Sequence, residues 1–321
     1  MSSHYDIRIS KIGTYIPERR VSNVDFLPTF GLNEDFLRTK LGIMTRAVKD
    51  PEEDTSDLCV KAFADLCAQT NIAPSDVQIC CVVTQNPDVS IPHTAAIVHQ
   101  KLGLGKACMT FDISQGCAGY VHGLALLTSL MTCLGLSHAL LFTCDPYSKI
   151  VNPQDKNTAL IFGDAASVTY LTPGTPGFVL VDASFGTEPG STSCLYLNDA
   201  QLKGDAAPCL QMDGTTVLFH ATRVVPASIR ALLGKHGKSV DEIDSFVLHP
   251  GSKRVVDLIK KDLKVPGEKV PFEIEQYGNT VSSSIPLMMK NYIEGRKRGP
   301  LVLSGFGVGF SWGTCLLEFR D

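Results

Sequence analysis

The stretch that decides the fold is Asp112-Ile113-Ser114-Gln115-Gly116-Cys117-Ala118-Gly119-Tyr120, which joins a strand pattern to a helix pattern. Residues 107–113 predict an apolar strand, and apolar residues at helical spacing follow from about Ala118 to Leu136. Cys117 is therefore expected at a helix N-terminus, where unpaired backbone N–H groups and the helix dipole favour a thiolate. This interpretation predicts a nucleophile. The alternative is a small core residue, which is the usual role of a free cysteine.

Strand and helix patterns alternate on both sides of this turn. The first set has strands expected at 6–16, 77–84, 107–113, 138–144 and 168–171 and helices at 58–69, 92–102 and 118–136. The second set has strands expected at 178–184, 245–248, 300–304 and 313–319 and helices at 218–236, 252–263 and 280–293. A Pro/Gly cluster at 172–177 separates the sets. The pattern predicts a layered α/β protein with an internal duplication, divided into halves 1–173 and 174–321.

The composition excludes several classes of protein. The 29 basic and 33 acidic residues give a net charge of -4, so no general attraction to nucleic acid or to an anionic membrane is expected. The N-terminus lacks the basic and apolar segments of a signal peptide, and no apolar run is long enough to cross a bilayer. We therefore expect a cytoplasmic protein.

The eleven cysteines form no CxxC pair and no cluster with histidine. Without such spacing, neither a disulfide framework nor a metal site is predicted. Apart from Cys117, these cysteines are expected to be reduced thiols in the core.

Two further polar residues are expected where strands end. His249 follows the apolar run 245–248, and Asn279 follows Gly278 just before a helix pattern. Ends of strands carry the chemistry in layered α/β folds. The alternatives are a structural histidine and a helix-capping asparagine.

Cys117, His249 and Asn279 together form a set that papain-like thiol hydrolases also use, in the same order and with His roughly 130 residues after Cys. In those enzymes the cysteine lies near the mature N-terminus within C-G-[SA]-C-[WY]. Here Cys117 follows a long α/β segment and lies in Gly-Cys-Ala-Gly. The hydrolase interpretation is therefore disfavoured.

The glycine-rich run Gly305-Phe306-Gly307-Val308-Gly309-Phe310-Ser311-Trp312-Gly313 joins two apolar strands. Such a turn allows close approach of a substrate and can present an N–H group to an oxyanion. The alternative is a plain β-hairpin. A dinucleotide site is excluded, because no helix follows the glycines.

Two further motifs accompany these: Ile161-Phe162-Gly163-Asp164-Ala165-Ala166 and Tyr277-Gly278-Asn279-Thr280. All of them occur in the order found in the beta-ketoacyl-ACP synthase III family. The chain resembles this family over nearly its whole length. The resemblance implies a thiolase fold, in which two related halves form five layers, α-β-α-β-α. It also implies a homodimer that uses no cofactor besides its acyl-CoA or acyl-ACP and malonyl-ACP substrates.

The mechanism implied by the resemblance is a decarboxylative condensation. Cys117 takes an acyl group from a thioester, and a malonyl thioester then loses carbon dioxide to give an enolate that attacks the acyl-cysteine. By resemblance, His249 and Asn279 donate hydrogen bonds to the enolate oxygen, and the N–H groups of Cys117 and Val308 hold the tetrahedral oxyanion. Neutral donors suffice, so no metal is expected.

The substrate entrance departs from the family pattern. Phe36 lies where tryptophan is typical of the family, and Lys40 and Lys156 lie where arginines are typical, whereas Arg254 retains the arginine. By resemblance, these four residues are expected to hold the adenine and phosphates of coenzyme A. Ser252 replaces an asparagine of the histidine motif. Helix 252–263 also carries several bases, which suit an acidic carrier protein or form a solvated face.

Ile91 replaces a phenylalanine that in the family reaches across the dimer into the acyl pocket. The smaller side chain suggests room for an acyl group longer than acetyl. Either fatty-acid or secondary-metabolite biosynthesis fits these features. Two alternatives remain open: an acyltransferase of the same fold that acylates an alcohol or amine without forming a carbon–carbon bond, and a non-catalytic partner subunit of a heterodimeric synthase.

Overall fold

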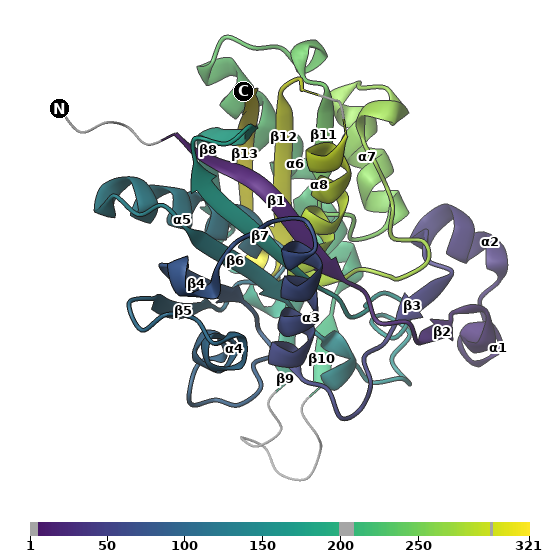
Figure 1. Cartoon of the computed structure of the whole chain (residues 1–321). Helices are drawn as coiled ribbons and strands as arrows, with labels where there is room; N and C mark the ends of the chain where they lie inside the picture. Colours follow the sequence, from purple (N-terminus) through teal and green to yellow (C-terminus); the bar gives the residue numbers. More distant parts are fainter. Residues whose placement is uncertain (1–5, 199–208, 296–297) are drawn as a thin grey trace.

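A computed structural model describes residues 6–198, 209–295 and 298–321. Within them, nine strands form one mixed sheet in the order β11-β12-β13-β8-β1-β7-β6-β4-β5 (Figure 1). In the first half, the strands are β1 (Ile7–Tyr15), β4 (Ile79–Val83), β5 (Met109–Ile113), β6 (Ala139–Cys144) and β7 (Ala166–Pro173). In the second half, they are β8 (Gly177–Thr187), β11 (Ser245–Leu248), β12 (Leu301–Gly307) and β13 (Ser311–Arg320).

The two halves repeat one strand arrangement, as expected from the sequence. The series β4-β6-β7-β1 is paired parallel, antiparallel and antiparallel, and the series β11-β12-β13-β8 repeats these directions. Strand β5 is an addition at the outer edge of the first half, parallel to β4. Among the described residues, β5 is thus the one strand of the sheet without a counterpart in the other half. The segment that leads to Cys117 directly follows this strand.

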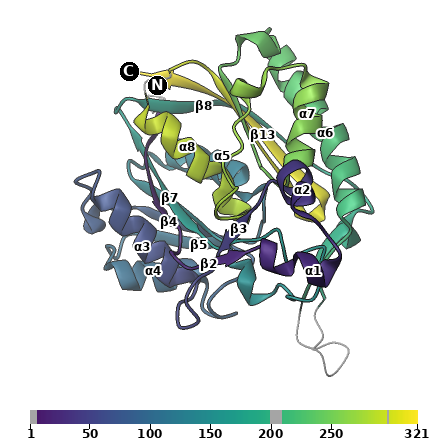
Figure 2. The ribbon, with the colours of Figure 1, turned by 90° about the vertical axis from the view of Figure 1, so that its right-hand side faces the viewer.

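Helices complete the five layers, which confirms the predicted α-β-α-β-α order (Figure 2). Helices α3 and α4 cover the outer face of the first half-sheet, and α6 covers that of the second, with α7 packed against it. Helix α5 lies between the halves and contacts β4 and β6 on one side and β8, β12 and β13 on the other, while α8 contacts β1, β7 and β11. The helices are α3 (Thr55–Cys67), α4 (Thr94–Leu102), α5 (Gly119–Leu134), α6 (Gly214–Lys235), α7 (Lys253–Leu263) and α8 (Ser284–Glu294).

Hydrogen bonds join the halves at several places. Strands β1 and β8 pair antiparallel over a short length, Arg8 with Val179 and Ile9 with Phe178, which makes the two half-sheets continuous. The second junction is a run of three buried serines before and at the start of α8. Ser282 donates to Asp145, Ser283 donates to the Thr143 carbonyl (3.0 Å), and Ser284 accepts from the Thr280 N–H (3.1 Å). Two of these hydroxyls thus fix the start of α8 to the end of β6.

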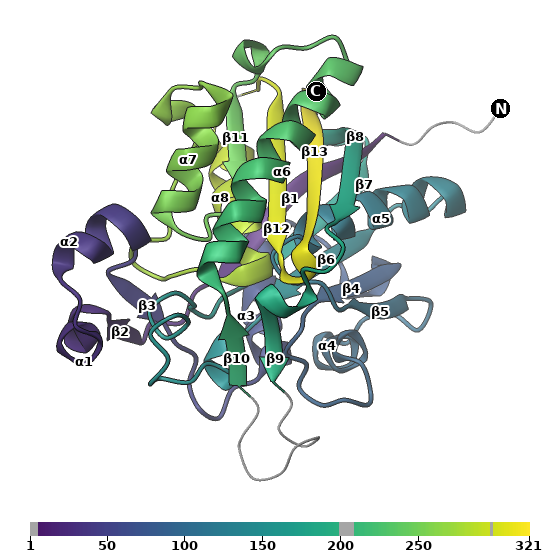
Figure 3. The ribbon, with the colours of Figure 1, turned by 180° about the vertical axis from the view of Figure 1, so that it is seen from behind.

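Some sequence-based boundaries need correction. Helix α3 begins at Thr55, earlier than the expected 58, and its N-cap is Asp54, which forms a reciprocal capping box with Asp57. Helix α6 begins at Gly214, earlier than the expected 218, since Asp213 caps it by accepting from the N–H groups of Thr215 and Thr216. Between β8 and α6, where no strand is expected, the chain forms a hairpin of β9 (Leu195–Asn198) and β10 (Cys209–Met212) (Figure 3).

The division at 173/174 remains a prediction, although β7 ends at Pro173 and β8 begins at Gly177. All eleven cysteines are free, as expected, but Cys67 and Cys133 are exposed, which corrects the assignment of every cysteine other than Cys117 to the core.

Candidate active site

Cys117 lies in the loop between β5 and α5, two residues before the helix begins at Gly119. Its side chain is buried, with an exposed fraction of 4%. The end of β12 passes directly over it: a Cβ added to Gly307 would lie 3.0 Å from the Cys117 Cβ and 3.1 Å from Sγ. The glycine-rich run therefore approaches the nucleophile itself, so closely that a side chain at Gly307 would crowd Cys117.

The protonation state of Cys117 differs from the sequence-based expectation. Burial raises the pKa of the Cys117 thiol well above its ordinary value, and the nearby Asp145 carboxylate raises it further. The helix start that was expected to favour a thiolate is therefore outweighed by loss of solvent. In the free protein, Cys117 rests as a neutral thiol.

His249 comes directly after β11, where its backbone N–H donates to the Ser304 carbonyl of β12 at 2.8 Å. The ring is 2% exposed and packs edge-on against Phe306, with 5.6 Å between ring centroids. Burial lowers the pKa of His249 to about 3, so the imidazole is neutral at physiological pH. A neutral imidazole can donate one hydrogen bond without introducing a charge.

Asn279 is held by backbone pairing with the first half. Its N–H donates to the Ile161 carbonyl at 2.9 Å, and its carbonyl accepts from the Gly163 N–H at 3.0 Å. The side-chain Oδ1 accepts from the N–H of Val281 at 2.8 Å. Val281 adopts φ 55, a left-handed conformation that is strained for a β-branched residue. This arrangement occupies Oδ1 and leaves the amide nitrogen, Nδ2, to point elsewhere.

His249 and Asn279 meet at one point of a cavity that Cys117 also lines. The Asn279 Nδ2 and His249 Nε2 atoms are 3.3 Å apart, and the His249 Nδ1 has no hydrogen-bond partner among the described residues. With the ring proton on Nε2, both nitrogens would offer an N–H group to one oxygen placed between them. The structure thus brings together the three residues predicted to be catalytic.

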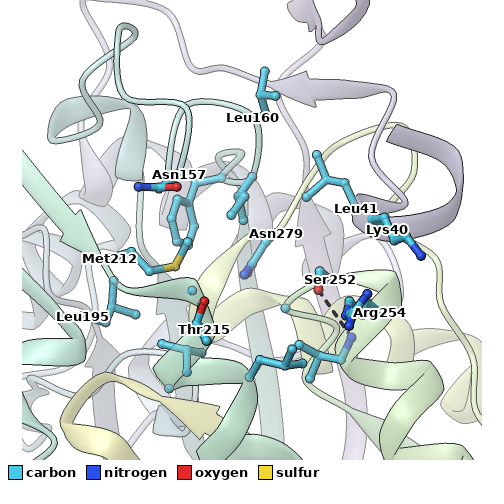
Figure 4. A pocket seen from close by; sticks show the side chains of 18 of the residues that line it. Lys40, Leu41, Asn157, Leu160, Leu195, Met212, Thr215, Ser252, Arg254 and Asn279 are labelled. Atoms are coloured by element: carbon cyan, nitrogen blue, oxygen red, sulfur yellow. Dashed lines mark hydrogen bonds between the residues drawn. The ribbon is translucent and has the colours of Figure 1, made fainter. Parts of the chain in front are cut away.

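The cavity has a volume of about 780 Å³, which falls within the usual range for small-molecule sites. Figure 4 shows Leu195 and Met212 on one wall and Lys40, Ser252 and Arg254 on the opposite side, with Asn279 between them. The remaining walls are largely apolar. They include Phe162, Val217, Leu218, Phe306, Ile161 and Leu160.

The residues predicted at the entrance all line this cavity. Phe36 ends the short helix α2 (Glu34–Phe36), and Lys40 lies on the following π-helical turn, Leu37–Leu41. Lys40, Lys156 and Arg254 are exposed, and none of them forms an ion pair with a described residue. Ser252 is half-buried, and its hydroxyl caps α7 by accepting from the Val255 N–H at 3.4 Å.

Two predicted site residues do not line the cavity of their own chain. Val308 follows Gly307, and its side chain packs near Gly116: a Cβ added there would lie 3.4 Å from a Val308 methyl group. Ile91 lies in the loop after β4 and is 88% exposed. The roles predicted for both residues stay predictions.

Several cavity residues were not predicted from the sequence. Leu195 and Met212 come from the unpredicted β9–β10 hairpin, and Val217 and Leu218 come from the first turns of α6. The signal that could have found them is Asp213 followed by Thr215 and Thr216, a capping pattern that places the helix start beside the cavity. Long-range packing of the hairpin has no such local signal.

Within residues 6–198, 209–295 and 298–321, no group of three or more His, Cys, Asp or Glu side chains is arranged to bind a metal ion. None of the helices in this part of the chain combines the length and apolar character needed to span a bilayer.

Known proteins match this chain over nearly its full length. Residues 111–189 match the family described as 3-oxoacyl-[acyl-carrier-protein (ACP)] synthase III, and residues 233–319 match its C-terminal part. A beta-ketoacyl-[acyl-carrier-protein] synthase III of Ehrlichia ruminantium is 31% identical over 97% of this chain and 98% of its own. The corresponding protein of Symbiobacterium thermophilum is 32% identical over 98% of both chains.

Solved structures agree. A crystal structure of a 3-oxoacyl-(acyl-carrier-protein) synthase III superposes with a TM-score of 0.89 at 30% identity, covering 98% of this chain and 100% of its own. The priming beta-ketosynthase of the R1128 polyketide pathway superposes with a TM-score of 0.91 at 25% identity, covering 100% of this chain and 98% of its own. The expected thiolase fold is confirmed, and the chain belongs to the beta-ketoacyl-ACP synthase III family of condensing enzymes.

Proposed function

We propose that this chain catalyses a decarboxylative Claisen condensation between an acyl thioester and malonyl-ACP, in fatty-acid or polyketide biosynthesis. The observation that supports it best is that Cys117, His249 and Asn279, from loops in both halves, line one cavity, in which His249 and Asn279 are 3.3 Å apart. A nucleophile beside two neutral hydrogen-bond donors suits a reaction in which negative charge develops on oxygen.

In the first half-reaction, the Cys117 sulfur attacks the carbonyl carbon of the acyl thioester. The N–H groups of Cys117 and Val308 stabilise the tetrahedral oxyanion. As the intermediate collapses, the bond to the old sulfur breaks and the departing thiolate takes up the proton that Cys117 loses. One thioester replaces another, so neither a metal nor a redox step is required.

In the second half-reaction, the malonyl carboxylate leaves as carbon dioxide, and the electron pair of the broken bond moves into the thioester to form an enolate. His249 Nε2–H and Asn279 Nδ2–H donate to the enolate oxygen. The enolate carbon attacks the acyl carbon on Cys117, the carbon–sulfur bond breaks, and the sulfur leaves as a thiolate that takes up a proton from solvent to restore the resting thiol. Each of these donors is expected to contribute roughly 3 kcal/mol to transition-state stabilisation.

Phe36, Lys40, Lys156, Arg254 and Ser252 are proposed to receive the carrier of the acyl group. The three cations are unpaired within the described chain and border the cavity, which suits phosphate groups. Lysines bind phosphate as point charges and not as bidentate forks, so the grip on coenzyme A is expected to be weak.

An acyl carrier protein is the proposed partner at this mouth, docking on α7. On this helix, Lys253 and Lys260 both pair with Asp257, at 4.0 and 2.7 Å, which partly neutralises their charge. A homodimer is also proposed. It would bury the exposed Ile91 and place this side chain against the acyl pocket of the partner subunit.

The test is intact-mass measurement of the protein after incubation with acetyl-, hexanoyl- and octanoyl-CoA and the corresponding acyl-ACPs, followed by assay of carbon dioxide release from malonyl-ACP. An acyl adduct on Cys117 with carbon dioxide release is expected. An adduct without carbon dioxide release, with transfer to an alcohol or amine, favours the acyltransferase alternative. No adduct with any donor favours the non-catalytic subunit.

The same panel tests the acyl length. Because isoleucine is smaller than phenylalanine, we expect hexanoyl or octanoyl groups to acylate Cys117 at least as fast as acetyl. A clear preference for acetyl would contradict the role given to Ile91.

A further inference from the structure

Asp145 is a buried acidic residue that the proposed reaction does not use. It directly follows β6, at the end of the strand that faces the active-site loops, and its exposed fraction is 0%. No described lysine, arginine or histidine forms an ion pair with it. A buried carboxylate without a cation is costly, so its hydrogen bonds must hold it.

Asp145 joins three segments around Cys117. Its Oδ1 accepts from the backbone N–H of Gln85 at 2.6 Å, and its Oδ2 accepts from the hydroxyl of Ser282. Tyr147, two residues further along the chain, donates its hydroxyl to the Gln85 Oε1 at 2.9 Å. The loop after β4, the loop after β6 and the start of α8 are thus tied to one carboxylate.

This network reaches the nucleophile through Gln85. The Gln85 Oε1 lies against the residue before Cys117, where a Cβ added to Gly116 would be only 2.6 Å away. The Asp145 carboxylate raises the pKa of three titratable groups, Cys117, Cys144 and Tyr147, none of them cationic. Its negative charge therefore acts on the Cys117 sulfur without a positive charge to offset it.

We propose that Asp145 is a positioning residue for Cys117: its hydrogen bonds fix the loops that carry the nucleophile, and its carboxylate, in addition to burial, opposes negative charge on the resting sulfur. The proposal rests on Cys117 being the nucleophile. A neutral thiol reacts slowly with alkylating and oxidising agents, whereas a thiolate reacts fast. The charge opposes the thiolate but not the uncharged thioester, so the resting enzyme is protected and the acyl-enzyme carries no penalty.

The test is the pH dependence of Cys117 alkylation by iodoacetamide, followed by intact mass and peptide mapping. Asp145→Asn removes the charge but keeps an acceptor for the Gln85 N–H and a partner for the Ser282 hydroxyl. We expect the Cys117 pKa obtained from the alkylation profile to fall in this variant. For each unit of decrease, the alkylation rate should rise only about threefold, because a thiolate of lower pKa is more abundant but less nucleophilic. Burial raises the pKa of Asp145 to about 6, so variant and wild type should converge below that pH.

Asp164→Asn is the matched control. Asp164 is also fully buried, and it accepts from the Ser148 hydroxyl at 2.5 Å and from the backbone N–H groups of Ser148 and Lys49. Cys117 is not among the groups that it faces, so this variant should leave the Cys117 profile unchanged. Ser282→Ala provides a second comparison, since it loosens the network and keeps the charge; it should lower Tm without accelerating alkylation.

Two results would overturn the inference: an unshifted profile in Asp145→Asn, or equal acceleration in Ser282→Ala. Should Asp145→Asn fail to fold, the wild-type profile decides, and the absence of an inflection near pH 6 refutes the role. Alkylation needs no acyl donor. A failure of the proposed condensation, seen as no acyl adduct, is therefore distinguishable from a failure of this inference.

Discussion

The inner end of the cavity and its mouth differ in how they are held in place. Cys117, His249 and Asn279 at the inner end are nearly inaccessible and uncharged. Backbone hydrogen bonds hold His249 to Ser304 of β12 and hold Asn279 to Ile161 and Gly163. At the mouth, Lys40 and Arg254 are exposed, charged and without an ion-pair partner in the described chain. The chemistry is therefore expected to depend on geometry, and recognition of the carrier on weak, screened electrostatics.

This difference predicts which substitutions should impair the enzyme most. A side chain at the inner end has no alternative position and no water to replace it, whereas a cation at the mouth can be replaced by a neighbour or by salt. Substitutions at the inner end should alter the chemical steps, and those at the mouth should alter KM.

Cys117→Ala gives the largest expected effect. Without sulfur there is no acyl acceptor, so no acyl adduct and no condensation should be detected. Intact mass after incubation with acyl-CoA measures this, with the wild type beside it. An adduct of the same size on the variant would move the nucleophile to another residue.

His249→Ala should separate the two half-reactions. Self-acylation should persist, while carbon dioxide release from malonyl-ACP should fall by about 10²–10³, since one donor to the enolate oxygen is lost. Single-turnover acylation and carbon dioxide release are measured on the same preparation. Normal condensation would exclude the role given to His249.

Acid should reveal the buried neutral state of His249. Its pKa is about 3 in the folded protein and near 6.5 when unfolded, so the unfolded chain binds the proton first as pH falls. Stability from this group is therefore present above pH 6.5 and is lost towards pH 3. Relative to wild type, His249→Gln should gain about 3 kcal/mol in the free energy of unfolding between pH 7.5 and 4.5. Denaturant titrations at both values test this, and a constant difference would contradict it.

Asp145 should change stability with pH in the opposite direction to His249, and the same denaturant titrations measure this change. Its pKa of about 6 lies above its unfolded value, so the folded state binds this proton first. The stability it contributes is present at low pH and lost as pH rises through 6. Asp145→Asn should remove this gain, leaving the variant more sensitive to acid than wild type.

Gly305→Ala tests the close passage of β12 over the nucleophile. Its Cβ would lie 2.5 Å from the Cys117 carbonyl oxygen and 2.9 Å from the Ala118 Cα, so the backbone must shift. We expect a loss of about 1–3 kcal/mol in stability and slower acylation. Gly234→Ala in α6, with no atom within 4 Å of the added Cβ, is the matched control. Thermal unfolding and acylation rates measure both.

Single alanine substitutions of Lys40, Lys156 and Arg254 should have the smallest effects. Each should raise KM for acyl-CoA less than about tenfold, more at low salt, and leave kcat unchanged. Lys235→Ala, remote from the cavity and paired with Asp182, serves as the control. A fall in kcat without a change in KM would place the lysines in the chemistry and remove the distinction between the two ends.

The sequence predicted most of the sheet and the catalytic residues because both leave local signals. Apolar runs such as 79–83 are buried on both faces. His249 directly follows the apolar run 245–248, and Asn279 follows Gly278 just before a helix pattern. The β9–β10 hairpin left no such signal, since its residues 196–198 are exposed. The charge state of Cys117 was also missed, because burial and the proximity of Asp145 arise only in the folded chain.

The run Ser282-Ser283-Ser284 has a consequence for how the chain assembles. Methyl groups at Ser282 and Ser283 would let the start of α8 slide along β6 at little cost, whereas their buried hydroxyls need partners that only the first half supplies: Asp145 for Ser282, and Thr143 and Ala165 for Ser283. A chain whose halves docked out of register would leave these hydroxyls, and the Asp145 carboxylate, unpaired inside the protein. These hydrogen bonds therefore stabilise only correctly docked halves, and correct docking is also what places Asn279 beside His249.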